Sequence, residues 1–169
     1  ITLWRCPAST RIDSAVALGS TVTGEIDAYT YNGYGIYATA IAYDGGAVAI
    51  GAQTSAYTGD AVLYSNGNIG ATAAGFYGAV AMGSLTQADD FAGTYTYGDI
   101  YANAYAFDGD AIAMGSQTLG YVAETFDNGS ISANAHTVYG DATATGALTV
   151  GTPYAGLFGY GDIYATAVT

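Results

Sequence analysis

A 32-residue repeat is the feature of this sequence that most restricts its fold. The apolar phrase AVAIGAQT, at positions 47–54, returns in four near copies, and each copy holds a glycine at the same place. These glycines are Gly19, Gly51, Gly83, Gly115 and Gly146, so the steps are 32, 32, 32 and 31 residues. Tandem repeats of this length are typical of solenoids, propellers and arrays, in which one unit cannot bury its own apolar face. We therefore expect stability to come from the stacking of neighbouring units.

A second phrase repeats in step with the first. It reads DIYANA at 99–104, and its isoleucines are Ile36, Ile69, Ile100, Ile131 and Ile163, which are separated by 33, 31, 31 and 32 residues. Both phrases alternate with a period of two, which is the pleat of a strand. Tyr, Ile, Val and Thr favour strands, whereas each glycine disfavours helix by about 1 kcal/mol relative to alanine. The sequence predicts an all-β chain of five repeats without significant helix.

Two arrangements of the strands fit this pattern. Asp-Gly and Asn-Gly dipeptides suit two-residue hairpin turns, and they favour extended, closely stacked antiparallel hairpin sheets in which residues 36–43 pair with 46–53. One face of such a pair is almost entirely Ala and Gly, so a second sheet can approach it closely. The alternative is a parallel β-solenoid, in which each repeat is one coil and equivalent residues stack directly. A polar ladder would then be formed by Thr39, Thr72, Asn103, Asn134 and Thr166.

The repeat begins near residue 15, which predicts a single β-repeat domain over 15–169 and an irregular segment over 1–14. That segment holds Trp4, Arg5, Cys6 and Arg11, and we expect it to dock onto the acidic surface of a neighbouring copy. The single cysteine excludes an internal disulfide and leaves Cys6 as a candidate for an intermolecular one. A first residue that is not Met suggests a mature exported chain or a fragment.

Charge excludes several classes of partner. Fourteen Asp and Glu residues oppose two Arg residues, and the net charge is −12. Binding to nucleic acid or to an anionic membrane surface depends on clustered Lys and Arg, which this chain lacks. Its apolar runs also fall far short of the roughly 20 residues needed to cross a bilayer. We expect neither nucleic-acid binding nor membrane insertion.

No residue set typical of an active site is found. His136 is the only histidine, which rules out a cluster of His and Cys around a metal, and most acidic residues lie in or beside predicted turns, where Asp commonly bonds to the backbone. We therefore expect no enzymatic activity, no small-molecule substrate and no cofactor. Structural calcium stays open at 88–91 and 107–110, where carboxylates gather.

Tyrosine is the most unusual component of this chain. Tyr37, Tyr101 and Tyr164 occupy one repeated position, so they should form a row along a sheet face, where aromatic pairs contribute on the order of 1 kcal/mol beyond burial. We predict these tyrosines, with Trp4, Arg5 and Arg11, as assembly contacts; a sugar-binding or adhesive strip is the alternative. Asn128 begins a formal N-glycosylation sequon on a predicted turn.

Two resemblances accompany these patterns. The segments AVAIG at 47–51 and AVAMG at 79–83 resemble the short head repeats of trimeric autotransporter adhesins, whose Ala-Val-Ala-Ile-Gly strands build a β-roll. The acidic, Gly/Ala/Tyr-rich composition of the whole chain is similar to that of the tubular sheath proteins of filamentous methanogens. Both resemblances imply an extracellular or cell-surface location.

These observations favour a structural subunit that assembles with copies of itself into an extracellular β-rich fibre, sheath or surface layer. The sequence starts and stops within the same strand phase and shows no polar terminal cap, so we expect polymerisation end to end or edge to edge. The alternative is an adhesin or another surface-binding β-repeat module, which binds a glycan or binds ice, in the latter case through its Thr/Asn row.

Overall fold

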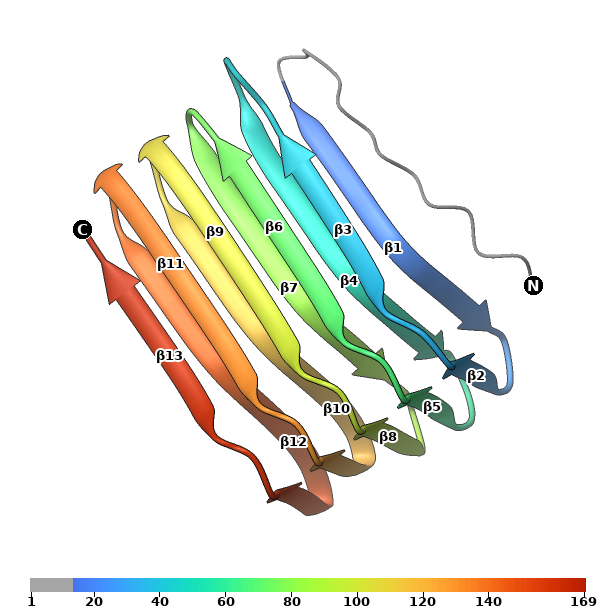
Figure 1. The fold of residues 1–169 in the computed structure, drawn as a ribbon. Coiled ribbons are helices and arrows are strands. Elements are labelled where there is room, and N and C mark those ends of the chain that lie inside the picture. Colours follow the sequence, from blue (N-terminus) through green and yellow to red (C-terminus); the bar gives the residue numbers. More distant parts are fainter. Residues whose placement is uncertain (1–13) are drawn as a thin grey trace.

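The protein is a parallel β-solenoid of stacked coils (Figure 1). The structure, a computed structural model, describes residues 14–169 and contains no helix within them. Trp4, Arg5, Cys6 and Arg11 lie outside the described residues, as does all of the predicted docking segment except Ser14.

Each coil consists of a first, a second and a third strand segment. The first three coils are β1–β3, β4–β6 and β7–β9, and in the last two coils the long strands β10 and β12 supply both the first and the second segments. The strands are β1 (Ala15–Gly24), β2 (Ala28–Asn32), β3 (Ile36–Ile41), β4 (Gly46–Ala56), β5 (Ala61–Ser65), β6 (Ile69–Gly75), β7 (Gly78–Gln87), β8 (Phe91–Thr96), β9 (Ile100–Asp108), β10 (Ala111–Asp127), β11 (Ile131–Tyr139), β12 (Ala142–Gly159) and β13 (Ile163–Val168).

Every strand pairs in parallel with its own copy in the next coil. The third segments form a 5-stranded sheet in the order β13-β11-β9-β6-β3, and the first and second segments form an 8-stranded sheet joined through β10. The register places equivalent residues side by side, as in Ala47↔Ala79 and Ile100↔Ile131. The predicted all-β chain of five tandem repeats is thereby confirmed, and the parallel solenoid is the arrangement that it adopts.

The antiparallel hairpin sheets, which were the favoured arrangement, do not form. Strands β3 and β4, which were expected to pair, lie in different sheets, and the Asp-Gly turn between them joins two layers. Two-residue hairpin turns need positive φ, yet within residues 14–169 only Gly109 and Gly140 have it. The parallel arrangement is favoured because it places equivalent residues beside each other in successive coils. The backbone of each coil can then form hydrogen bonds with the backbone of the preceding coil.

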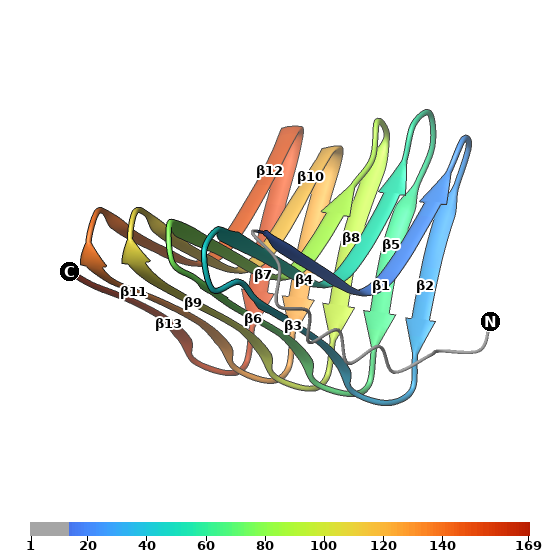
Figure 2. The same ribbon diagram turned by 90° about the horizontal axis from the view of Figure 1, so that it is seen from above.

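Viewed from above, each coil is bent like the letter L (Figure 2). In one limb the first and third segments face each other as two layers, and the space between them is filled almost entirely by alanine; Ala49, Ala71 and Ala81 are fully buried there. Along β3, Tyr37 and Ile41 alternate with inward alanines and are exposed on the outside. The predicted separation of a small-residue face from a bulky face is confirmed.

The glycine of the first phrase and the isoleucine of the second meet at the bend of the L. Along β4 the in-out alternation shifts at Gly51, where Gly51 and Ala52 are both buried in succession. A Cβ built on Gly83 would lie 2.5 Å from Ile100 Cγ2 and 2.4 Å from the carbonyl oxygen of Gly115. The two phrases therefore repeat together because the isoleucine fills the space that only glycine leaves open.

A ladder of buried threonines runs through the second limb, with a cluster of buried alanines nearer its tip. The first segment rises along this limb, turns at the tip and returns as the second segment, so that their inner side chains face each other (Figure 2). Thr94 Oγ1 lies 2.8 Å from Thr86 Oγ1 and 2.9 Å from Thr118 Oγ1, and Thr125 Oγ1 lies 2.8 Å from those of Thr118 and Thr149. Each hydroxyl can donate one bond and accept others, so the zigzag satisfies buried polar groups from coil to coil.

Substituting alanine for Gly83 should destabilise the fold by about 1–3 kcal/mol, the usual cost of overpacking, because both the Ile100 side chain and a backbone carbonyl would have to move. Gly78→Ala is the matched control, since a Cβ there would meet only the Asp110 carbonyl oxygen at an ordinary 3.5 Å. Chemical unfolding followed by circular dichroism measures both variants. Equal stability of the two would contradict the proposed contact at the bend.

Candidate interaction faces

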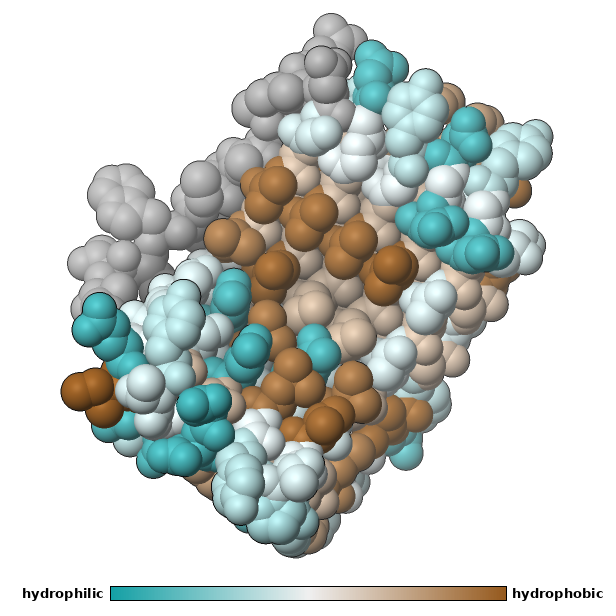
Figure 3. Space-filling model, turned by 180° about the vertical axis from the view of Figure 1, so that it is seen from behind, coloured by the Kyte–Doolittle hydropathy of each residue, from teal (hydrophilic) through white to brown (hydrophobic). Residues whose placement is uncertain are grey.

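The outer face of the first strand segments is flat and aliphatic. The register aligns two outward rows across the coils, with no charged side chain in either. The rows are Val16, Val48, Val80, Ile112 and Thr143, and Leu18, Ile50, Met82, Met114 and Thr145. Figure 3 shows brown side chains crossing this face, with most of the teal toward its margins. We call it the aliphatic face.

The outer face of the third strand segments carries the Thr/Asn row that the solenoid alternative predicted. Its residues pair in register across the 5-stranded sheet: Thr39, Thr72, Asn103, Asn134 and Thr166. Asn134 Nδ2 donates a hydrogen bond to Asn103 Oδ1 at 3.0 Å, so these amides form part of a ladder. This face, which we call the Thr/Asn face, contains no carboxylate in its outward rows.

The predicted row of Tyr37, Tyr101 and Tyr164 flanks the Thr/Asn row on the same face. Gly70 and Ser132 occupy the positions between the tyrosines, so large and small residues alternate from coil to coil. The Tyr101 ring covers Gly70 and lies 6.1 Å from the Tyr37 ring, centroid to centroid, at an angle of 37°. Burial raises the pKa of Tyr101. Tyr164 Oη donates to Asp162 Oδ2 at 2.6 Å.

A second aromatic row, on the outer face of the second segments, was missed by the sequence reasoning. It consists of Tyr31, Tyr64, Tyr95, Phe126 and Phe158, one in each coil. Tyr95 Oη donates to Glu124 Oε2 at 3.0 Å, and its pKa is raised to about 12, first by burial and then by this hydrogen bond and the carboxylate charge. An aromatic residue recurring every 31 to 33 positions was the signal that could have revealed this row.

The buried threonine ladder was also missed, although its signal was present. Thr54, Thr86, Thr118 and Thr149 each close a copy of the glycine-containing phrase. Their alignment is visible in the sequence, but the residues that face them come from the returning second segment. Only the fold at the tip of the limb brings the two sets together.

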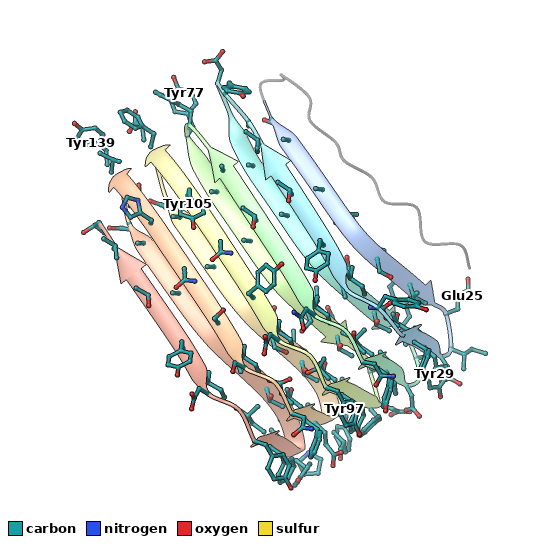
Figure 4. The ribbon with its side chains drawn as sticks, in the orientation of Figure 1. Glu25, Tyr29, Tyr77, Tyr97, Tyr105 and Tyr139 are labelled. Carbon is teal, nitrogen blue, oxygen red and sulfur yellow. The ribbon has the colours of Figure 1, made fainter. Side chains whose placement is uncertain are left out.

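Carboxylates gather at the corners and tips of the coils. Several accept hydrogen bonds from the backbone of the next coil: Asp27 Oδ1 from Asp60 N at 3.0 Å, Asp99 Oδ1 from Ser130 N at 2.9 Å, and Asp110 Oδ1 from Asp141 N at 3.1 Å. Acids beside turns were expected to bond to the backbone, and these carboxylates do so across to the next coil, so that they connect successive coils. Figure 4 shows aromatic side chains gathered at the same places, with Tyr77 and Tyr139 at one end of the coils and Tyr29 and Tyr97 at the other.

Asp127 is the exception, because it is a buried acid. It is 2% exposed and accepts a hydrogen bond from Thr96 Oγ1. Burial is the main cause that raises its pKa, and the nearby Asp99 charge adds to the rise, whereas the bonds from Thr96 and from the Gly129 backbone oppose it.

The other predicted residues lie apart from one another. His136 is exposed in the outward row that also contains Tyr105, and Asn128 is exposed at a corner, where its backbone N–H donates to Thr96 O at 2.9 Å. Within residues 14–169 no three His, Cys, Asp or Glu side chains come close enough to hold a metal ion, including those at 88–91 and 107–110. Nor does this part of the chain form a helix with the length and apolarity of a membrane span.

No protein-family model, curated protein sequence or solved structure matches this chain significantly. The function of this protein is therefore inferred from the chemistry of its faces and corners. They consist of two flat uncharged faces, an aromatic row on the second limb and an acidic margin.

Replacing Asp127 with Asn should raise the melting temperature at about pH 7 and have less effect near pH 3. A raised pKa means that the folded chain holds this proton more tightly than the unfolded chain does. The contribution of Asp127 to the free energy of unfolding therefore falls as the pH rises from the ordinary Asp pKa through the folded pKa. Above the folded pKa the charged side chain continues to destabilise the fold. The amide keeps an acceptor for Thr96. Thermal unfolding at both pH values measures the effect, and an equal gain at each would rule out titration as its cause.

Proposed function

We propose that this protein is a non-enzymatic structural module that associates with copies of itself in an extracellular β-rich fibre, sheath or surface layer. The observation that carries the proposal is that successive coils contact one another through copies of the same residues. A coil that fits the next coil of its own chain also fits the equivalent coil of another copy.

Chemical detail at the coil-to-coil contacts supports this proposal. Alanine stacks on alanine, isoleucine on isoleucine, and serine on serine, as with Ser84 Oγ, which donates to Ser116 Oγ at 2.9 Å. Each contact is made without an ion pair that would specify one particular neighbour. In-register stacking of this kind pairs every internal strand edge, so we expect the assembled material to resist heat and detergent.

The distribution of charge points the same way. The aliphatic and Thr/Asn faces carry no carboxylate in their outward rows, while Asp residues line the corners. Flat uncharged faces favour side-by-side packing of copies, and acidic margins keep the assembly hydrated. The similarity in composition to sheath proteins is in accord with this proposal.

The last coil shows what another coil would cover. Ile163 is 46% exposed and Leu157 is 43% exposed, whereas Ile131 and Leu63, at the same positions of inner coils, are 0% exposed. Further coils of the same chain or a coil of another copy would bury these side chains through the same contacts.

Purified chain should form ordered polymers visible by electron microscopy, and Ala165→Asp should abolish their elongation. Ala165 occupies an inward position that is buried in the preceding coil, where it corresponds to Ala133, so stacking another coil would bury an unpaired charge. Thr166→Asp is the control for the coil edge, since this neighbouring side chain points outward onto the Thr/Asn face and takes no part in stacking the next coil. Circular dichroism checks that both variants fold. A wild-type chain that stays a dispersed monomer at high concentration would contradict the proposal. Equal polymerisation by the two variants would exclude stacking at this edge.

The exposed Thr/Asn row supports a second candidate function, which is binding to an ordered surface such as ice or a glycan. If the row binds ice, Thr39→Tyr or Thr72→Tyr should abolish thermal hysteresis, because a large ring breaks the flat row; a glycan array tests the unmodified chain for binding to sugars. Thr143→Tyr, on the aliphatic face, is the control. Absence of both activities in the unmodified chain would exclude this alternative.

A further inference from the structure

Two tyrosines in neighbouring coils are stacked face to face. Tyr31 on β2 and Tyr64 on β5 are register partners, and their ring centroids lie 5.3 Å apart with an angle of only 6° between the ring planes. Both side chains point outward, and Tyr31 is 72% exposed. The pair is therefore held together by the backbone register while it remains open to solutes.

The neighbourhood of this pair sets it apart from the other aromatic contacts. Tyr97 lies beside Tyr64 but is tilted, with 5.6 Å between centroids and 53° between planes, and Asn66 Nδ2 donates to Tyr31 Oη at 3.3 Å. Further along the row, Tyr95 Oη is bonded to Glu124, and the last two coils have Phe126 and Phe158, which lack a hydroxyl. The tyrosine part of the row is thus confined to the first three coils.

Composition narrows the chemistry available for covalent reinforcement. The chain has 17 tyrosines, a single cysteine and no lysine, since both of its basic residues are Arg5 and Arg11. This chain therefore cannot form isopeptide or aldehyde cross-links through lysine, and it cannot form an internal disulfide. Coupling between phenol rings is the cross-link that this sequence can support in quantity.

From this geometry we propose that Tyr31 and Tyr64 form an intramolecular dityrosine cross-link under peroxide and a haem peroxidase. The oxidant removes one electron and one proton from each phenol, which leaves two phenoxyl radicals. An ortho carbon of one ring then bonds to an ortho carbon of the other, and each ring regains its aromaticity as its ortho hydrogen moves to oxygen. Two hydrogen atoms are lost overall, and one hydrogen peroxide is reduced to two waters.

The register between β2 and β5 and the exposure of Tyr31 both favour the coupling of the two rings. Two radicals on register partners meet without diffusion, which gives them a high effective concentration relative to tyrosines elsewhere. The rings must swing from a stacked to an edge-to-edge arrangement to bond, and the exposure of Tyr31 leaves room for that motion. The product ties the first coil covalently to the second. It forms within one chain, so it does not depend on the proposed self-assembly.

Treating the dilute full-length chain with a haem peroxidase and limiting hydrogen peroxide tests the assignment. The monomer fraction is isolated by size under denaturing conditions, digested with pepsin and mapped by mass spectrometry. We expect a joined peptide pair that contains Tyr31 and Tyr64 and is lighter than the sum of its parts by two hydrogen atoms. Dityrosine fluorescence should accompany it.

Phenylalanine variants decide whether the stacked pair is responsible. Tyr31→Phe keeps the ring and its stacking but removes the hydroxyl, so the joined peptide should be lost. Tyr37→Phe removes one ring of the tilted Tyr37–Tyr101 pair instead and should leave the product unchanged. Joining of Tyr64 to Tyr97, links only between chains, or an unchanged product in Tyr31→Phe would each overturn the proposal. Failure of the chain to polymerise would affect none of these readouts.

Discussion

In-register parallel stacking of identical residues is the constraint on which the rest of this structure depends. Each strand finds its hydrogen-bonding partner one repeat further along the chain, as with Ala47 and Ala79, so the local backbone of one coil is completed by the next. Because the partner has the same side chain, every position must be compatible with itself at the spacing of neighbouring strands. Alanine, isoleucine, threonine and tyrosine meet this condition, since they pack or hydrogen-bond with their own kind. A buried acid meets it poorly, and the row that contains Asp127 has a different residue in the neighbouring coils.

The small size of the interior residues determines what the outside can do. With an alanine core in one limb and a threonine ladder in the other, the layers need few large side chains between them. The bulky residues are therefore displaced to the surface, where they form rows along flat faces. An ordinary globular domain uses such side chains to fill its core, whereas this chain presents them to whatever lies beside it. The proposed role in association rests on this arrangement.

The faces and the corners divide two tasks. Uncharged rows cover the two flat faces, and within residues 14–169 most of the carboxylates lie at the corners and tips of the coils, where several accept hydrogen bonds from the backbone of the next coil. The proposed structural role uses the faces and coil edges for contact and the corners for solvation. The register that stabilises the coils also holds the oxidisable rings of Tyr31 and Tyr64 against each other. The proposed dityrosine link depends on this alignment.

The sequence by itself determined the period, the all-β class, the separation of alanine from bulky residues and the alignment of Tyr37, Tyr101 and Tyr164, because all of these are properties of a repeat with period-two alternation. It favoured antiparallel hairpins over the solenoid that forms, because Asp-Gly and Asn-Gly are typical of two-residue hairpin turns but also occur where a solenoid coil turns between layers. Tertiary structure alone decided that β3 and β4 lie in facing layers, that Ile100 fills the space over Gly83, and that Thr94 meets Thr86 and Thr118. These contacts join residues across the bend and the tip of a coil, where the path of the backbone in space, and not the spacing along the chain, sets which side chains meet.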